Sequence, residues 1–250
     1  MKIKKILVSQ PKPETDKSPY FELAQKTNVK IDFRPFIQVE GVTSKEFRGQ
    51  KVDVLAHSAV IFTSKTAIDN FFRINCEMRI LVPESMKYFC VSESIAYYLQ
   101  KYIVYRKRKI FYGNGEFPDM IDLLIKHKDE RFMVPLSDQH KKIIPELLQK
   151  NNLKHTIAIL YKTISSDLSD LTSINYDVLV FFSPSGIKSL LKNFPEFQQN
   201  DIKIASFGTH TAQAVKEAGL RLDLQAPLPE APSMTMALEQ FILEHNKQFK

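Results

Sequence analysis

Short apolar runs alternate with longer amphipathic segments along most of this chain. The runs Lys5–Val8 and Val178–Phe182 are typical of buried strands. In the segments that follow such runs, apolar side chains recur at intervals of three and four residues, as at Ile68, Phe71 and Phe72, which predicts helices with one buried face. Strands that alternate with helices form parallel sheets with helices on both faces. The pattern therefore predicts the α/β class.

The strand, turn and helix pattern occurs twice in the chain. Residues 61–68 resemble residues 180–187, and residues 88–96 resemble residues 204–212. In each segment an apolar strand leads into a turn rich in hydroxyl groups and then into a helix. Such internal similarity predicts two similar α/β halves, each with its own parallel sheet.

Two fainter similarities extend this repeat. Residues 5–8 resemble residues 132–134, and both are expected to end at polar turns that contain proline. Residues 29–33 resemble residues 156–160, and both are expected to be strands that follow a helix. Gly219 is expected to end the last helix of the repeat, because glycine adopts the left-handed conformation found at helix ends.

The turns between strands and helices carry the candidate binding residues. Ligands of such sheets bind at the carboxyl ends of the strands. Free N–H groups at helix starts attract anions, and hydroxyl groups there also serve as helix caps. Capping remains the alternative for each turn, but four turns in matching positions favour a ligand with many carboxylates or phosphates. The turn residues are Thr63, Ser64, Ser92, Ser94, Ser183, Ser185, Gly208, Thr209 and Thr211.

The net charge of +7 is consistent with an anionic partner, although simple solubility is the alternative. The basic run Tyr105–Ile110 has no nucleic-acid-binding module beside it, so no nucleic-acid partner is expected. The apolar runs are shorter than the roughly 20 residues of a membrane helix, and Met1–Val8 does not resemble a signal peptide. Two cysteines form no disulfide framework. We therefore expect a cytoplasmic protein without a membrane partner.

Several common chemistries lack their residues. The segment Gly113–Gly115 begins like a dinucleotide loop, but Pro118 replaces the third glycine. There is no phosphate-binding loop, and Phe181 stands where a nucleophile elbow around Ser183 needs glycine. The six histidines show no metal-binding spacing, so no metal is expected, and His210 is expected to have a surface or capping role. Cys90, in an apolar strand, is expected to be a buried thiol.

Five segments, in the right order over nearly the whole chain, resemble the uroporphyrinogen-III synthase family. The most specific of them is the run Phe181–Gly186 within Asp177–Gly186. The others are Val60–Ser64, Tyr161–Thr163, Ile204–Ala212 and the proline-rich tail Ala226–Ser233.

The resemblance implies two flavodoxin-like α/β domains joined by a two-stranded linker. One domain would consist of residues 1–36 and 164–250, and the other of residues 38–160. The chain would cross between them near residues 34–37 and 161–164.

The resemblance also implies a reaction. The family cyclises hydroxymethylbilane to uroporphyrinogen III through a spiro intermediate, with inversion of the terminal ring and without metal or cofactor. A monomeric cytoplasmic lyase is then expected. The substrate carries eight carboxylates, so the turn residues above, together with Gly186, would bind them. Tyr161 would donate the proton to the leaving hydroxyl group, and the alternative is a linker tyrosine that only packs.

Three positions depart from the family pattern. Gln10 stands where the family often has arginine, and Ile95 replaces a hydroxyl-bearing residue. Glu93 adds a negative charge beside a turn that is expected to bind anions. These departures leave open a catalytically weak or non-catalytic protein that binds a tetrapyrrole or another anion. A phosphosugar- or nucleotide-binding α/β protein is a further alternative, and the missing phosphate loop and scarce glycines argue against it.

Overall fold

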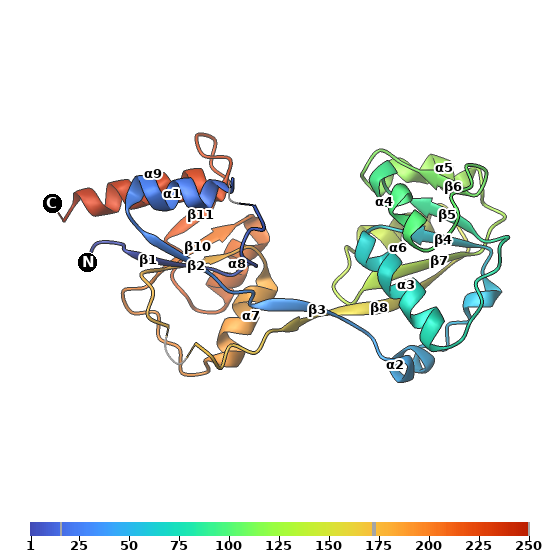
Figure 1. Cartoon of the computed structure of the whole chain (residues 1–250), viewed down its shortest axis with the longest axis horizontal. Coiled ribbons are helices and arrows are strands. Elements are labelled where there is room, and N and C mark those ends of the chain that lie inside the picture. The colour runs from blue at the N-terminus through green and yellow to red at the C-terminus, as the bar shows by residue number, and fades with distance from the viewer. Residues whose placement is uncertain (16, 172–173, 250) are drawn as a thin grey trace. The chain divides into compact units, whose positions relative to one another are not determined.

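A computed structural model describes residues 1–15, 17–171 and 174–249 of the chain. The chain divides into two compact units (Figure 1). Unit 1 contains Met1–Gln38 and Ile164–Lys250, and unit 2 contains Val39–Thr163. The chain therefore passes from one unit to the other twice, and each unit builds its own hydrophobic core.

Unit 1 is a five-stranded parallel sheet with helices on both faces. Its strand order is β11-β10-β9-β1-β2, with bounds β1 (Lys5–Val8), β2 (Lys30–Phe33), β9 (Val178–Phe181), β10 (Lys203–Phe207) and β11 (Leu224–Ala226). The helices are α1 (Pro19–Thr27), α7 (Pro184–Asn193), α8 (Thr209–Glu217) and α9 (Met234–Lys247). Alternate strand residues point to opposite faces, so Ile6 and Val8 pack with α1 and α9, whereas Leu7 packs with α7 and α8.

Unit 2 is a six-stranded sheet of order β3-β8-β7-β4-β5-β6. The strands are β3 (Ile37–Gly41), β4 (Ala59–Phe62), β5 (Lys87–Cys90), β6 (Ile110–Tyr112), β7 (Phe132–Ser137) and β8 (His155–Ser165). Helices α2 (Ser44–Gly49), α3 (Lys65–Glu77) and α4 (Glu93–Tyr98) contribute to the core on one face. Helices α5 (Ile121–Ile125) and α6 (Ile143–Lys150) contribute to the core on the other face. Three short 3-10 helices are η1 (Val54–Ala56), η2 (Leu99–Lys101) and η3 (Pro118–Met120).

The two sheets share one spatial order, and this confirms the predicted α/β class with two similar parallel sheets. Across unit 1 the order is β2-β1-β9-β10-β11, and across unit 2 it is β8-β7-β4-β5-β6. The segments predicted to repeat occupy equivalent strands, because β4 matches β9, β5 matches β10, β7 matches β1 and β8 matches β2. This is the flavodoxin-like order, entered by the chain at a different strand in each unit.

Strand β3 lies beside β8 at one edge of the second sheet. The Val42 N–H donates to the Leu160 carbonyl at 2.9 Å, and the Ser166 N–H donates to the Phe36 carbonyl at 2.9 Å. Partner numbers rise along one segment as they fall along the other, so the two segments run antiparallel. All other strand pairs with a described register are parallel.

Two predictions about single residues are confirmed, and one about a turn is wrong. Gly219 has φ of +71° directly after α8, and Cys90 is buried in β5. The strand from Phe132, however, does not end in a turn at Pro135 but continues to Ser137. Strand β7 pairs with β4 only at its first residues, so Pro135 lies where no N–H is needed on that side.

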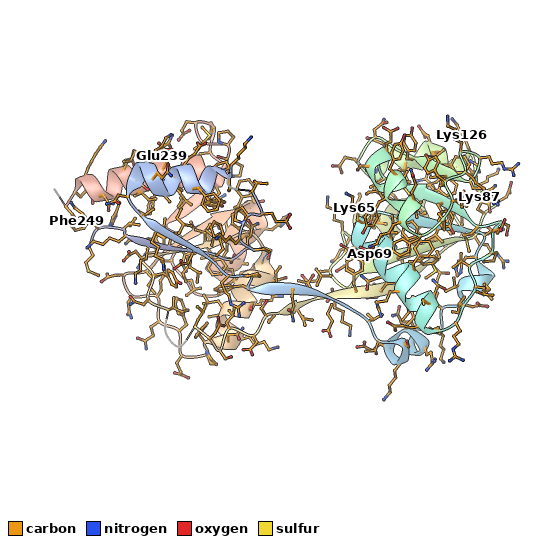
Figure 2. All side chains as sticks on the ribbon, in the orientation of Figure 1. Lys65, Asp69, Lys87, Lys126, Glu239 and Phe249 are labelled. Atoms are coloured by element: carbon orange, nitrogen blue, oxygen red, sulfur yellow. The ribbon has the colours of Figure 1, made fainter. Side chains whose placement is uncertain are left out.

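Asp69 joins α3 to the segment that follows α4. The Tyr98 hydroxyl donates to its carboxylate at 2.9 Å, the Lys101 ammonium donates at 3.0 Å, and the Tyr102 hydroxyl also donates to it. Lys65, one turn before Asp69 on α3 (Figure 2), lies 5.4 Å from the centre of the Tyr98 ring. Burial raises the pKa of Asp69, but these hydrogen bonds outweigh it and the pKa is lowered.

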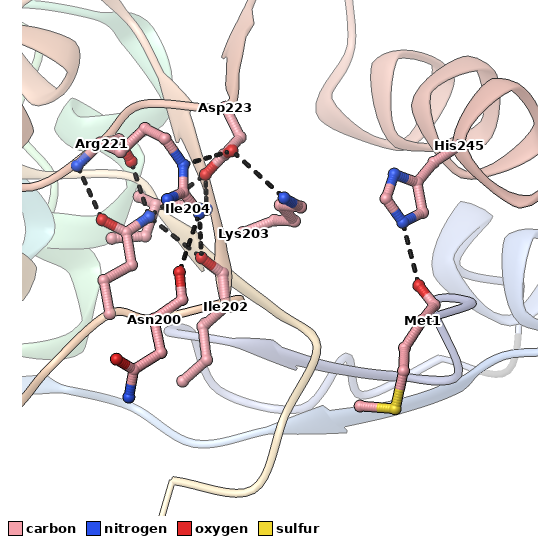
Figure 3. Close-up of polar contacts among 9 residues, drawn as sticks. Met1, Asn200, Ile202, Lys203, Ile204, Arg221, Asp223 and His245 are labelled. Carbon is pink, nitrogen blue, oxygen red and sulfur yellow. Dashed lines mark hydrogen bonds and ion pairs between the residues drawn. The ribbon is translucent and has the colours of Figure 1, made fainter. Parts of the chain in front are cut away.

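Asp223 connects two segments at the amino ends of the strands in unit 1 (Figure 3). Its carboxylate accepts hydrogen bonds from the Ile204 N–H and the Arg221 Nε–H, both at 2.9 Å, and the Lys203 ammonium lies 3.8 Å away. Arg221 also donates to the Ile202 carbonyl at 3.1 Å. These bonds connect the start of β10 to the loop that leads into β11.

Among the described residues, no helix is both long and apolar enough to cross a bilayer. The longest helix, α9, has 14 residues.

Glu46 ties α2 to β8. Its carboxylate accepts hydrogen bonds from the N–H of the helix cap Thr43 at 2.8 Å and from the Lys162 ammonium at 2.5 Å. The Glu46 N–H in turn donates to the Thr43 hydroxyl at 3.2 Å, which completes a capping box. The hydrogen bond from Lys162, followed by those from Thr43, lowers the pKa of Glu46 from 4.5 to about 2.

We predict that Glu46→Gln lowers the melting temperature modestly at pH 7 and that the difference disappears in acid. A carboxyl group with a lowered pKa in the folded state stabilises that state above its unfolded pKa of 4.5. This stabilisation is lost as the pH falls toward about 2. Thermal unfolding from pH 7 to pH 2 measures the effect, with the exposed Glu14→Gln as control. A difference in melting temperature that stays constant over this range would contradict the assignment.

Candidate functional site

The chain order reverses at the centre of the sheet in unit 2. Strands β4 and β7 are adjacent and parallel, but β7 is followed by β8 on one side, whereas β4 is followed by β5 on the other. Such a reversal opens a crevice at the carboxyl ends of the two strands. A pocket of about 340 Å³ lies here, and its lining includes Thr63 after β4, Ser137 at the end of β7 and Tyr161 on β8.

Tyr161 is held in this pocket by Ser64. The phenol oxygen lies 3.1 Å from the Ser64 hydroxyl oxygen. Ser64 is also the N-cap of α3, because its oxygen accepts a hydrogen bond from the Ala67 N–H at 3.0 Å. Either hydroxyl can donate in this contact, and when Ser64 donates, the phenol proton is left for a ligand. Partial positive charge at the start of α3 favours negative charge on this oxygen pair. The arrangement therefore suits a proton donor.

The structure thus brings together three of the residues predicted from the sequence, namely Thr63, Ser64 and Tyr161. Thr163, two residues after Tyr161, donates its N–H to the Asp138 carboxylate at 3.0 Å. This bond ties the end of β8 to the loop after β7, so the wall that carries Tyr161 is anchored on a second side of the pocket.

His140 also lines the pocket, although it was not among the residues predicted from the sequence. Its Nδ1 lies 2.7 Å from the Ser137 carbonyl oxygen. A carbonyl only accepts hydrogen bonds, so Nδ1 carries the proton and Nε2 of the neutral ring can accept one. The polar residues that follow β7 could have pointed to His140. The strand was expected to end at Val134, however, so the predicted turn began three residues before the end of β7 at Ser137.

Hydroxyl groups cap the helices at two other predicted turns. Ser92 accepts from the Ile95 N–H at 3.4 Å at the start of α4, and its oxygen lies 3.0 Å from that of Ser94. Ser183 accepts from the Gly186 N–H at 3.2 Å at the start of α7. Capping is thus shown for Ser64, Ser92 and Ser183.

Gly186 is buried where the carboxyl ends of β9 and β1 meet. A side-chain carbon at this position would lie 3.2 Å from the Phe181 ring and 3.8 Å from the hydroxyl oxygens of Ser183 and Ser9. The Phe181 ring is the close neighbour, so the glycine leaves room for that ring. Ser9, which follows β1, lies at ordinary contact distance, so the ends of β9 and β1 meet at this turn. This is the chain reversal of unit 1, equivalent to the one that carries the pocket in unit 2.

In the turn before α8, only some of the residues that were predicted to bind a ligand are exposed. Gly208 has φ of +84°, a conformation that favours glycine, and its N–H donates to the Ala226 carbonyl at 2.7 Å. Thr209 and His210 are exposed, whereas Thr211 is 3% exposed. Ser185 is half-buried in the first turn of α7.

Glu93, the acidic departure, is exposed in the first turn of α4. Its carboxylate accepts a hydrogen bond from the Tyr112 hydroxyl at 3.0 Å, and this bond raises the pKa of Tyr112. Glu93 therefore has a protein partner on the neighbouring strand β6. Within the described part of the chain, no three histidine, cysteine or acidic side chains are grouped as a metal site.

Comparisons with known proteins point to one family. The model of the family described as uroporphyrinogen-III synthase HemD matches residues 18–236, which is most of the chain. No curated protein matches it.

The chain is similar to solved structures of the same description. The uroporphyrinogen-III synthetase of Helicobacter pylori is 17% identical with a TM-score of 0.58, over 99% of this chain and 100% of that chain. A mutant uroporphyrinogen III synthase of Thermus thermophilus is 14% identical with a TM-score of 0.49, over 99% of this chain and 100% of that chain. At these identities the likeness concerns the fold, and the first of the two structures supports it.

Proposed function

Because this chain belongs to the uroporphyrinogen-III synthase family, we propose that it cyclises hydroxymethylbilane to uroporphyrinogen III with inversion of the terminal ring. The family consists of cyclising lyases of haem biosynthesis. The family match over residues 18–236 carries the proposal, and the pocket around Tyr161 supports it. A phosphosugar- or nucleotide-binding protein gains no support from this match.

The reaction requires one proton donor and a pocket that holds a curled chain. The hydroxyl group of the substrate leaves as water after it accepts a proton, so one C–O bond breaks. Carbon–carbon bonds form and break at the spiro centre, and a final bond closes the ring with the terminal pyrrole inverted. One proton leaves a ring carbon at closure, which balances the proton donated at the start. The net products are uroporphyrinogen III and water.

In our proposal Tyr161 donates the first proton and Ser64 positions it. The phenolate left behind accepts a hydrogen bond from the Ser64 hydroxyl, whose oxygen lies 3.1 Å away at the start of α3. Such oriented donors stabilise charge that develops during the reaction. His140 lines the same pocket, and its Nε2 can accept the proton released at closure.

We propose that the turns that follow the strands in each unit bind substrate carboxylates. The groups at these turns are the hydroxyls of Thr63, Ser92, Ser94, Ser183, Ser185 and Thr209. Gly208 shapes its turn, because its own N–H is bonded to the Ala226 carbonyl. Helix starts favour anions through their free N–H groups. The buried positions Gly186 and Thr211 would shape these turns from behind.

We further propose that the protein acts as a monomer in the cytoplasm. In each unit, helices of the same unit contribute to the cores on both faces of the sheet, which leaves no sheet face in need of a partner subunit. The free thiol of Cys76 is exposed, as is common in reducing compartments. Light scattering of the purified protein tests the monomer.

We predict that the purified protein converts hydroxymethylbilane to the type III isomer without added metal. Spontaneous closure gives the type I isomer, so the ratio of isomers reports enzymatic turnover. Chromatographic separation of the oxidised products measures this ratio. If only type I product forms over a range of protein concentrations, the protein is a non-catalytic member of its family.

We predict that Tyr161→Phe lowers kcat by roughly ten-fold or more, because loss of a general acid has effects of this order. The control is Tyr176→Phe, which removes a hydroxyl group bonded to Asp32 at 3.2 Å in unit 1. Steady-state kinetics and circular dichroism separate turnover from folding. An unchanged kcat in Tyr161→Phe would assign Tyr161 a packing role.

Ser64→Ala tests the positioning role separately. Loss of a helix cap costs about 1 kcal/mol of stability, both here and in the control Ser233→Ala, which removes the cap of α9. Only Ser64 contacts the Tyr161 hydroxyl, so we predict that Ser64→Ala alone lowers kcat, by roughly five-fold. Equal kcat in the two variants would limit Ser64 to capping.

A further inference from the structure

A second pocket, of about 470 Å³, lies at the opposite end of the sheet in unit 2. The segments 80–86 and 102–109 line it, directly before β5 and β6, together with the last turns of α3. The pocket around Tyr161, which we call the reaction pocket because the proposed reaction takes place there, lies at the carboxyl ends of the strands. The second pocket lies at their amino ends. Ser64 and Asn75 are eleven residues apart on α3, which corresponds to roughly 16 Å along the helix. We call this cavity the amino-end pocket.

Aromatic side chains form a rigid wall of the amino-end pocket. The rings of Phe72 and Tyr102 are stacked, with their centres 4.5 Å apart and their planes 8° from parallel. The Tyr102 hydroxyl donates to Asp69, so the ring is fixed at its outer end. Leu81 and Val104 also line the pocket and are 89% and 76% exposed. Such exposed apolar side chains beside a preformed cavity are typical of a ligand site.

Asn75 lines the pocket, and its side-chain oxygen is buried without a partner in the described part of the chain. The side chain is 2% exposed, and its Nδ2 donates to the Phe71 carbonyl at 2.7 Å. This bond fixes the orientation of the amide, since the oxygen cannot take the place of the nitrogen beside a carbonyl. Among the described residues, Oδ1 has no hydrogen-bond partner. A buried acceptor without a partner is costly, and this oxygen is too buried for a ligand to contact it directly.

The rim of the amino-end pocket is cationic. Arg106 and Lys109 line it, and the exposed residues Lys107 and Arg108 stand between them in the sequence. One acidic residue, Glu84, also lines the pocket and lies 3.1 Å from the Arg106 guanidinium. Two cations against one carboxylate favour an anionic group at the rim.

We propose that the amino-end pocket binds a compact apolar anion. Its apolar body lies against the Phe72 and Tyr102 rings, and its anionic group lies at Arg106 and Lys109. The site does not depend on the proposed reaction, because it shares no lining residue with the reaction pocket.

The thiol of Cys76 lines the amino-end pocket and reports its occupancy. Cys76 is exposed, whereas Cys90 is buried and burial raises the pKa of its thiol to about 12. A neutral alkylating reagent such as N-ethylmaleimide therefore modifies Cys76 selectively in the folded protein. Cys76→Ser, which removes the reactive thiol, is the control for this selectivity.

The probe is 8-anilinonaphthalene-1-sulfonate, an apolar anion with one N–H group. We predict that saturating probe slows alkylation of Cys76 by roughly ten-fold, because a ligand that fills the pocket blocks access of the reagent to a residue that lines it. An unchanged alkylation rate in the presence of bound probe, or the absence of binding, would overturn the proposal.

Charge variants test the anionic part of the ligand. We predict that Arg106→Gln weakens binding of this probe by roughly five-fold and that raised salt weakens it in the native protein. The neutral analogue N-phenyl-1-naphthylamine should bind equally to both proteins. Lys126→Gln, at an exposed lysine at the end of α5 (Figure 2), is the matched control and should not change either affinity. Equal effects of the two substitutions would overturn the assignment of the rim.

Discussion

Parallel strand pairing is the constraint that organises this structure. Strands β4, β7 and β8 run in one direction, so their carboxyl ends reach the same edge of the sheet in unit 2. Thr63, Ser137 and Tyr161 belong to segments far apart in the sequence, and they line one pocket because of this shared direction. The helical crossovers that parallel pairing requires also cover both faces of the sheet, which leaves the edge as the accessible place for a ligand.

Ser64 shows that capping and chemistry do not exclude each other at such an edge. The helix needs an acceptor for the Ala67 N–H, and the Ser64 oxygen supplies it at 3.0 Å. A hydroxyl oxygen has a second lone pair and a proton of its own, so the same atom also contacts the Tyr161 phenol. Ser183 caps α7 in the same way, but it lies beside Gly186 and Ser9. The two serines therefore cap their helices in the same way but have different neighbours in the two units.

Helix α3 runs between two pockets, one at each end of the strands, and the two pockets differ in polarity. Its start carries the hydroxyl-rich turn of the reaction pocket, and its last turns line an apolar cavity with a cationic rim. The difference arises from what surrounds each end of the strands. Turns after parallel strands lead into helix starts with free N–H groups, whereas the segments before β5 and β6 return from helices and carry apolar side chains such as Leu81 and Val104.

Properties that depend on near neighbours in the chain could be predicted from the sequence alone. Apolar periodicity predicted the strands and helices and the α/β class, the internal repeat predicted two equivalent sheets, and the helix end at Gly219 followed from its chemistry. Resemblance to a family selected Tyr161, whose catalytic role remains a prediction.

Which turns meet is a property of the tertiary structure. The distance between Ser64 and Tyr161 depends on strand order and register, which no local pattern encodes. The same holds for Pro135, which was expected to mark a turn but is accommodated in β7 because β4 pairs only with the start of that strand. His140 was missed for this reason, and the amino-end pocket joins segments with no motif in common. Strand order and register are set by the packing of the whole sheet. They cannot be predicted from local patterns in a single sequence.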